Sequence, residues 1–383
     1  MTSPTIHSRK CDLNLHIGEQ YQPQLEKDAY DSEALNHLVP HEALTASSPV
    51  FKAMLDGHFR EAQLQFSTNK PPTLELPEDH PEALTTLCDI LCDKDELGTG
   101  MTFSAIRHVA MLSNKYDCTK HVRPWFRWQI LRKTHSEEVW TGVSGDVQRW
   151  LPEDLADSLV SAYLLDDAHI FDLLSTVAVK TLPKEFIEKD NICRETLETL
   201  MPETFIEALP VANERVLQQL IDKCQSLIQS FLGRPTMDNG RKWADVEDGF
   251  STTPISAMCQ VGSQHLAQFM MVLQTFRLLP TADECRTTLY RAINVLSDVA
   301  KQHIIGGGVM SCRGPHGRGA GYSEWMCEWP WTKNLEVVIK SIEAKLHCIC
   351  LHCLKVNGGK PEDIMHSPAE CPRRIGADKE MSG

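Results

Sequence analysis

A Ser-Pro pair at positions 48 and 49 most constrains the fold, because it fixes where one helix begins. The Ser48 hydroxyl can cap the first turn, and Pro49 suits the first helical position because its missing N–H would be unsatisfied there anyway. Phe51 and Leu55 then fall on one helical face, and Gly57 supplies a stop. We therefore predict a short amphipathic helix that ends before Gly57 and turns its apolar face toward a core.

A strand and a second helix follow. Thr73–Leu76 alternates polar and apolar residues, as a half-buried strand does. Asp79, His80 and Pro81 then open a helix whose apolar residues recur at helical spacing. The apolar stripe of this second helix consists of Ala83, Leu84, Leu87, Cys88 and Leu91.

The residues before Ser48 predict two strands and a short helix. Residues 12–18 alternate and predict a strand. Residues 19–36 form a long polar insert without a clear period, which we expect to be dispensable for folding. Residues 37–40 are the best candidate for a resumed strand, and a short helix is expected at 41–46.

This order of elements, with the motifs ALTASSPVFKAMLDGHFREA and LELPEDHPEAL, resembles the BTB/POZ domain. In that family a leucine before an "xSpVF" helix is followed by a "g-x-f-x-E" turn, a strand and an "LpeddPea" helix start. The next stretch, AIRHVAMLSNKYDCTKHVRPWFRW, is similar to the helix that follows in fungal BTB proteins, which often reads "laDKYdc" and then a Trp. The resemblance covers roughly the first third of the chain. It implies an α+β fold, with a small sheet flanked by helices.

The rest of the chain resembles only the poorly understood C-terminal regions of fungal BTB proteins. Apolar residues from 137 to 232 recur at about the 3.6-residue helical period, which predicts short helices, with a break at Pro210 between 203–209 and 211–231. A last helix is expected at 334–349. The predicted regions are 10–120, BTB/POZ-like; 121–232, helical; 255–356, helical with a Gly- and Trp-rich loop; and 357–383, a flexible tail.

Composition limits the partners and the compartment. The chain has 383 residues and a formal net charge of −14. This charge argues against a nucleic-acid-binding surface, because such a surface needs a basic face. The N-terminus shows no apolar stretch of a secretory signal, and no run approaches the ~20 apolar residues of a membrane span. Fourteen cysteines without such a signal predict reduced thiols or a metal site in an intracellular protein, either nuclear or cytoplasmic.

The first candidate site is Phe59-Arg60-Glu61, between the Ser48 helix and the strand. BTB proteins that recruit a cullin ubiquitin-ligase scaffold carry a hydrophobic-x-Glu motif in this connection. The resemblance implies that Phe59 docks in a cullin groove and that Glu61 sets the local geometry by hydrogen bonding. The residues alone allow an alternative, in which Phe59 extends the apolar row of Phe51 and Leu55 into the domain and Glu61 is solvated.

The second candidate site is Cys350-x2-Cys353-x12-His366-x4-Cys371. Zinc prefers four thiolate or imidazole ligands in a tetrahedron, and two ligands two residues apart suit one turn of a knuckle. The spacing resembles a small zinc finger. The alternative is that the thiols pack the end of a terminal helix that is followed by a loose tail. Neighbouring residues that could replace a ligand are His347, Cys348 and His352.

A third set consists of Cys312, His316 and Cys327, near three tryptophans, Trp325, Trp329 and Trp331. A fourth ligand could come from Cys285, His303 or the C-terminal cysteines. Either a metal ion or burial of the tryptophans could hold the glycine-rich loop in one shape. Residues 306–321 lack the Gly-Lys-Ser/Thr ending of a phosphate-binding loop, and neither a G-x-S-x-G turn nor an H-E-x-x-H helix is present in the sequence. We therefore expect that the protein is not an enzyme.

The function that the sequence favours is protein–protein interaction, by self-association or by recruitment of a partner through the BTB-like domain. A sharper alternative of the same class is a substrate adaptor of a cullin-type ubiquitin ligase. An alternative of another class is a zinc-dependent regulator that binds nucleic acid, which the net charge disfavours.

Overall fold

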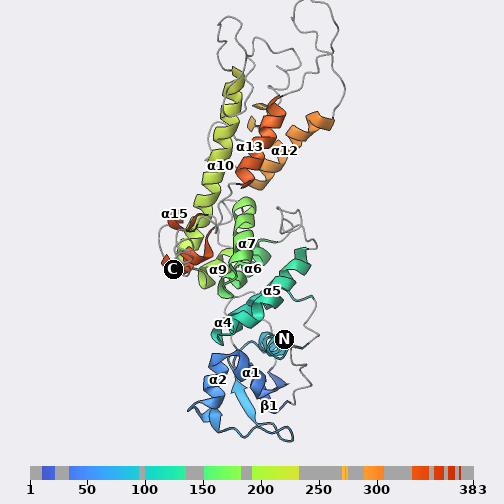
Figure 1. Cartoon of the computed structure of the whole chain (residues 1–383), viewed down its shortest axis with the longest axis vertical. Coiled ribbons are helices and arrows are strands. Elements are labelled where there is room, and N and C mark those ends of the chain that lie inside the picture. The colour runs from blue at the N-terminus through green and yellow to red at the C-terminus, as the bar shows by residue number, and fades with distance from the viewer. Residues whose placement is uncertain are drawn as a thin grey trace, which may run out of the picture. The chain divides into compact units, whose positions relative to one another are not determined.

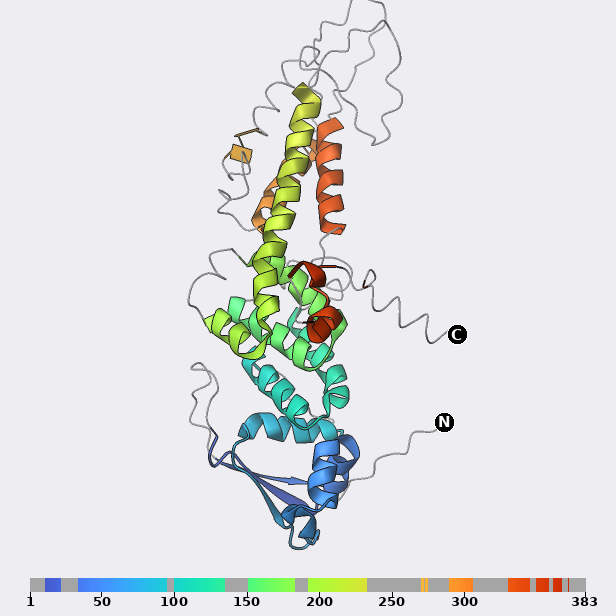
Figure 2. The same ribbon diagram turned by 90° about the vertical axis from the view of Figure 1, so that its left-hand side faces the viewer.

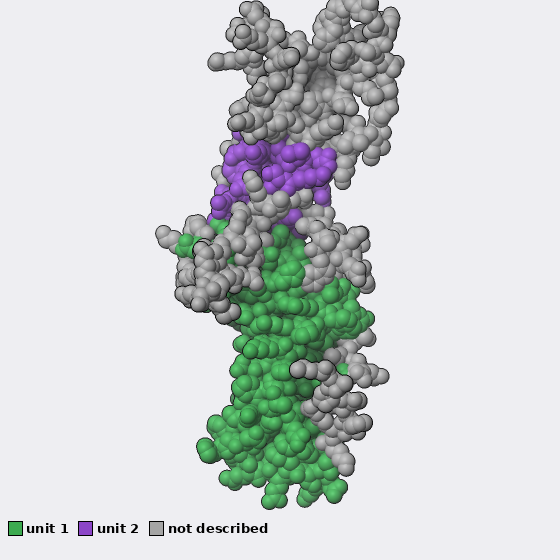
Figure 3. All heavy atoms as spheres, viewed as in Figure 1, with its two compact units in different colours: residues 1–178, 188–207, 348–383 green, residues 179–187, 208–347 purple. Residues whose placement is uncertain are grey.

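The chain divides into two compact units in the computed structural model. Unit 1 comprises residues 1–178, 188–207 and 348–383, and unit 2 comprises residues 179–187 and 208–347 (Figure 3). The predicted helical region 121–232 is therefore shared between the units, and the C-terminal residues from 348 onward belong with the N-terminal ones. The structure describes residues 11–21, 34–94, 100–134, 151–182, 192–232, 270–271, 273–274, 289–305, 330–344, 349–357, 361–366 and 371.

Unit 1 begins with a mixed α+β arrangement, as the sequence predicts (Figure 1, Figure 2). A small sheet is covered by short helices, and longer helices follow. In chain order the elements are β1 (Leu13–Ile17), β2 (Leu35–Val39), α1 (His41–Ser47), α2 (Pro49–Asp56), the 3-10 helix η2 (Arg60–Gln63), β3 (Thr73–Leu76), α3 (Pro81–Leu91), α4 (Phe103–Lys115) and α5 (Thr119–Thr134).

The sheet has the strand order β2-β1-β3. Strand β1 pairs antiparallel with β2, where Leu15 lies opposite His37, and parallel with β3, where Leu15 lies level with Leu74. Successive side chains of β1 point to opposite faces of the sheet, so that Leu13, Leu15 and Ile17 are buried on one face. Strand β2 begins at Leu35, earlier than the predicted start at 37, and the middle of the polar insert, 22–33, lies outside the described residues.

Helix α2 has the start, the buried face and the stop that its sequence predicts. The Ser48 hydroxyl oxygen accepts a hydrogen bond from the Phe51 amide at 3.0 Å and donates one to the Tyr116 carbonyl at 2.5 Å. The Phe51 ring is fully buried and stacks on Tyr116, with centroids 4.2 Å apart. At Gly57 a Cβ would lie 2.1 Å from the Ala53 carbonyl oxygen, so any larger residue would clash with the backbone of α2.

Unit 1 continues with further helices, of which α6 packs directly on α4 of the α+β part. They are α6 (Pro152–Leu164), most of α7 (Ala168–Thr181), α9 (Ile192–Leu200), the start of α10 (Glu203–Leu232), α14 (Leu351–Asn357) and α15 (Pro361–Ile364). Helices α4 and α6 share a buried ion pair, in which Arg107 Nε lies 2.9 Å from Asp157 Oδ1. The predicted boundary at residue 120 is therefore not a boundary between compact units.

The predicted break at Pro210 is wrong, because α10 runs through it from Glu203 to Leu232. A proline inside a helix removes the hydrogen bond to the carbonyl four residues back, here that of Ile206, and costs about 3 kcal/mol or more. The residues around it are buried, with Ala208 at 0%, Leu209 at 1% and Ala212 at 3% exposure. Burial of this apolar face offsets the local penalty, so tertiary packing overrides helix propensity.

Unit 2 contains the rest of α10 together with α12 (Leu289–Ile305) and α13 (Pro330–Ala344). Helices α12 and α13 contact each other through apolar faces that recur at helical spacing. The last predicted helix, 334–349, corresponds to α13, which begins earlier and ends at Ala344. Within the described residues, no helix is both long and apolar enough to cross a membrane.

Candidate functional site

The predicted partner-binding residues Phe59 and Glu61 lie in the connection between α2 and β3. Phe59 has extended backbone and immediately precedes η2, whose first turn contains Glu61. The Phe59 side chain is 60% exposed, so the alternative in which it enters the core is wrong. Hydrogen bonds from the Ala62 amide to the Phe59 carbonyl and from the Leu64 amide to the Glu61 carbonyl, each of 3.1 Å, close the turn.

This connection is anchored at both ends. It leaves α2 at Gly57, where the backbone passes close to Ala53. At the other end Phe66 stacks on the His41 ring, with centroids 3.9 Å apart. Asp12 holds His41 by accepting hydrogen bonds from its amide at 2.9 Å and pairing with its Nδ1 at 2.7 Å. The exposed Phe59 ring is therefore carried by a turn whose flanks are fixed.

The four predicted metal ligands lie together. Atoms from Cys350, Cys353, His366 and Cys371 that could bind a metal all lie within 4.8 Å of one another. The Cys353 Sγ atom is 3.4 Å from His366 Nε2 and 3.6 Å from Cys371 Sγ. The three cysteines are buried, at 3%, 3% and 1% exposure, and His366 is half-buried. We call these four residues the Cys/His cluster.

The backbone brings the two halves of the Cys/His cluster together. Ile349 and Met365 form an antiparallel β-bridge, and the Cys350 amide donates to the Ile364 carbonyl at 2.8 Å. Cys350 lies directly before α14 and Cys353 lies in its first turn. The CxxC pair therefore lies at the start of a separate helix, α14, and not at the end of the helix predicted at 334–349. Part of the predicted flexible tail forms α15, and Cys371 beyond it is buried.

Burial disfavours the ionisation of two of these thiols, those of Cys350 and Cys353. It raises the pKa of the Cys353 thiol to about 12, and the neighbouring Cys371 and Cys350 add to the shift. Burial also raises the pKa of the Cys350 thiol. Because a thiolate is the form that binds metals, a bound cation would have to favour the thiolates over the protonated state. Of the alternative ligands, His352 is exposed, and His347 and Cys348 lie outside the described residues.

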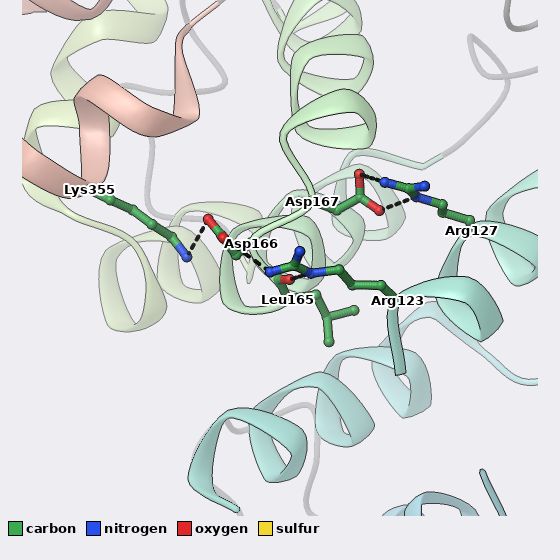
Figure 4. Close-up of polar contacts among 6 residues, drawn as sticks. All are labelled: Arg123, Arg127, Leu165, Asp166, Asp167 and Lys355. Atoms are coloured by element: carbon green, nitrogen blue, oxygen red, sulfur yellow. Dashed lines mark hydrogen bonds and ion pairs between the residues drawn. The ribbon is translucent and has the colours of Figure 1, made fainter. Parts of the chain in front are cut away.

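A polar network that sequence reasoning missed joins α5 to the corner between α6 and α7 (Figure 4). Arg127 binds both carboxylate oxygens of Asp167, with Nε–Oδ2 at 2.6 Å and Nη2–Oδ1 at 3.1 Å. Asp167 is fully buried and also accepts from the Ile170 amide at 3.3 Å, which caps α7. An Asp just before an apolar helical pattern is a capping signal, so this residue could have been found in the sequence.

The second part of this network involves Asp166. Arg123 Nη2 lies 3.0 Å from Asp166 Oδ2, and the Arg123 Nε–H donates to the Leu165 carbonyl (Figure 4). On the other side, Lys355 Nζ of α14 lies 3.2 Å from Asp166 Oδ1. Asp166 has left-handed backbone, with φ of 55°, which Asp and Asn tolerate better than most residues. One carboxylate thus contacts both α5 and the C-terminal helix α14.

Comparison with protein-family models, with curated proteins and with solved structures gives no match for this chain. The third predicted set, Cys312, His316 and Cys327, lies outside the described residues. All the cysteines that the structure describes are free thiols.

Proposed function

We propose that the chain is a protein–protein interaction protein whose N-terminal part is a BTB/POZ-like domain. Support comes from the order of β1, β2, α1, α2, β3 and α3, which follows the order that the sequence resemblance implies. The Ser48 cap and the Tyr116 ring, both within the resembling motifs, meet in one packed cluster around Phe51. Residues far apart in the motif therefore contribute to one core.

The observation that carries the proposal is the exposure of Phe59 on an anchored turn. A solvated aromatic ring with few degrees of freedom is the kind of side chain that dominates interfaces, and its truncation often costs about 2 kcal/mol or more in binding. Glu61 lies in the first turn of η2, within the same short segment. A partner with an apolar groove beside a hydrogen-bond donor would bind this pair.

The finer form of this proposal is a substrate adaptor of a cullin-type ubiquitin ligase. Its support is the position of Phe59-Arg60-Glu61 between α2 and β3, where the family resemblance places the cullin-docking motif. In this proposal Phe59 fills the cullin groove and Glu61 orients the turn. The net charge of −14 gives no support to a nucleic-acid-binding regulator.

Self-association is a second candidate, and the sheet edge favours it. Strand β2 pairs only with β1 among the described strands. Leu38 is 51% exposed and Leu35 is 39% exposed on this edge strand. An edge with exposed leucines is a template for strand addition from a second copy. Light scattering on wild-type protein and on Leu38→Lys tests this, because a lysine on the edge should lower the dimer fraction.

The adaptor proposal is tested with the full chain and a purified cullin scaffold. Phe59→Ala should weaken binding by ~30-fold, since a loss of about 2 kcal/mol at 1.4 kcal/mol per tenfold corresponds to that factor. Its melting temperature should stay close to wild type because the ring is exposed. Val337→Ala is the matched control, since Val337 is 59% exposed in unit 2 and should bind like wild type.

Two results would count against these roles. A large fall in the melting temperature of Phe59→Ala would mean that Phe59 supports the fold. Absence of cullin binding by the wild-type chain would remove the adaptor role. In that case, affinity capture with wild-type and Phe59→Ala baits would test the broader proposal, which requires at least one protein that only the wild type retains.

A further inference from the structure

We propose that Cys350, Cys353, His366 and Cys371 bind one Zn²⁺ ion, which holds the C-terminal residues folded on the α6–α7 corner of unit 1. This site is separate from the turn that carries Phe59. We call residues 349–357, 361–366 and 371 the ligand segment. The inference rests on the distances within the Cys/His cluster, on its burial and on the contacts that α14 makes.

The distances fit a tetrahedral zinc centre. With Zn–S of ~2.3 Å and Zn–N of ~2.0–2.1 Å, tetrahedral angles put two sulfur ligands ~3.8 Å apart and a sulfur and a nitrogen ligand ~3.5 Å apart. The Cys353–Cys371 separation is 3.6 Å and the Cys353–His366 separation is 3.4 Å. A disulfide would require about 2.05 Å between sulfurs, so this pair is not covalently joined. The remaining ligand pairs all lie within 4.8 Å.

The ligand types select the metal and its role. Three thiolates and one imidazole in a tetrahedron suit zinc, whereas magnesium and calcium prefer oxygen ligands. All four positions would be filled by protein side chains, which is typical of a structural site and leaves no open position for water or substrate. On binding, each thiol releases its proton to solvent as an S–Zn bond forms, and no atom changes oxidation state.

The ligand segment has a small apolar core of its own, so a metal would matter for its folding. Two short helices, α14 and α15, are joined by a single β-bridge. Small folded elements with little core commonly depend on a metal or disulfides. The buried apolar residues of this segment are Ile349, Leu351, Leu354, Ile364 and Met365.

The same helix joins the Cys/His cluster to the rest of unit 1. Lys355 follows Cys353 on α14 and pairs with Asp166 at 3.2 Å, while its ammonium lies 5.1 Å from the centroid of the Tyr163 ring. Asp166 is 54% exposed, and an exposed ion pair alone contributes little. The contact therefore depends on α14 being held in place by zinc, and zinc binding in turn fixes Lys355 beside the carboxylate that Arg123 also contacts (Figure 4).

Metal content of the full chain, expressed with zinc in the medium and desalted, is the first test. We expect one zinc per chain by elemental mass spectrometry. Cys353→Ser and Cys371→Ser should lose the zinc, whereas Cys224→Ser, which changes a fully buried thiol in unit 2, should keep it. Equal zinc in wild type and in both ligand variants, a wild type without zinc, or a Cys353–Cys371 disulfide in peptide mapping would each overturn the proposal.

A second measurement does not depend on the variants being folded. Wild-type protein loaded with Co²⁺ in place of zinc should show sulfur-to-cobalt charge-transfer absorption, because three thiolates would bind the ion. Absence of that absorption in stoichiometrically loaded protein would overturn the proposed ligand set. The band should vanish when zinc is added in excess, since both metals would compete for one site.

Hydrogen exchange tests the folding role. Removal of zinc by a chelator should speed exchange of the Cys350 and Leu354 amides, which donate to Ile364 and Cys350, by at least ~10-fold. Peptides from α2 should not change. Asp166→Asn keeps a residue that tolerates the left-handed backbone, so it should retain zinc and change exchange in α14 by less than ~10-fold, because an exposed ion pair contributes little. Loss of zinc from Asp166→Asn would refute the proposal that zinc, and not the ion pair, holds α14, and unchanged exchange after zinc removal would refute the folding role.

Discussion

The buried pair between Arg107 and Asp157 should be one of the most sensitive points of unit 1. Their side chains are 0% and 4% exposed, and Arg107 Nε lies 2.9 Å from Asp157 Oδ1. Asp157→Asn keeps the size of the side chain but removes its charge, so the buried guanidinium would lose the carboxylate that lies 2.9 Å from its Nε. Breaking one partner of such a pair costs ~3–5 kcal/mol. A domain is stable by only ~5–15 kcal/mol, so a large part of the stability would be lost.

The effect should be visible as a shift in the thermal transition. At ~2–4 °C per kcal/mol for a unit of this size, the loss corresponds to ~6–20 °C, measured by circular dichroism and checked by urea unfolding. The matched control is Glu75→Gln, whose carboxylate is 60% exposed and lies 4.0 Å from His16. This control should change stability by no more than ~0.5 kcal/mol, because exposed pairs contribute little.

A double substitution separates the cost of removing one charge of the pair from the contribution of the whole pair to stability. Arg107→Met with Asp157→Leu replaces both charges by apolar side chains, and such replacements of buried pairs are often neutral or stabilising. We expect the double variant to be more stable than Asp157→Asn. The reasoning would be refuted if Asp157→Asn melted like Glu75→Gln, or if the double variant were no more stable than Asp157→Asn.

Three further outcomes follow from the α+β part. Phe51→Ala should cost ~3–5 kcal/mol in urea unfolding, because Phe51 is fully buried against Tyr116. Tyr116→Phe should cost ~1–3 kcal/mol, because it removes the hydroxyl that donates to the buried Asp79 carboxylate, which Lys115 also binds at 2.6 Å. Replacing 22–33 by a short Gly-Ser linker should leave the melting temperature nearly unchanged, since closure entropy varies slowly with loop length, and an insoluble product would contradict this.

The elements of the α+β part could be predicted because their signals are local. The Ser48 cap, the stop at Gly57 and the alternation in Thr73–Leu76 each act through neighbouring residues, and the helix and the strand formed where expected. The start of β2 was misplaced because Leu35 and Asn36 follow a polar insert that offers no alternating signal. The pairing of Leu35 with Ile17 in the register of β1, which is a non-local contact, fixes that start.

Buried charges could not be predicted, because periodicity treats every charged residue as solvent-facing. Arg107 is buried on α4, where Asp157 of a later helix lies 2.9 Å from its Nε, and this contact is not local in the sequence. The same applies to Asp79, which is 3% exposed and is held by Lys115 and Tyr116 at the end of α4. The predicted helix break at Pro210 is wrong for the opposite reason. Proline is a strong local signal for a break, but burial of the neighbouring residues keeps the helix continuous.

The Cys/His cluster shows which part of a site a sequence can specify. Ligand chemistry resides in side-chain identity, so the CxxC pair and the later His and Cys could be chosen from spacing alone. Proximity depends on backbone pairing: the bridge between Ile349 and Met365 brings Cys350 toward His366, and neither bridge residue carries a sequence signal for it. The contact of Lys355 with Asp166 is equally non-local. Because zinc would bind residues on both sides of that bridge, its loss should release the bridge and the Lys355 contact together.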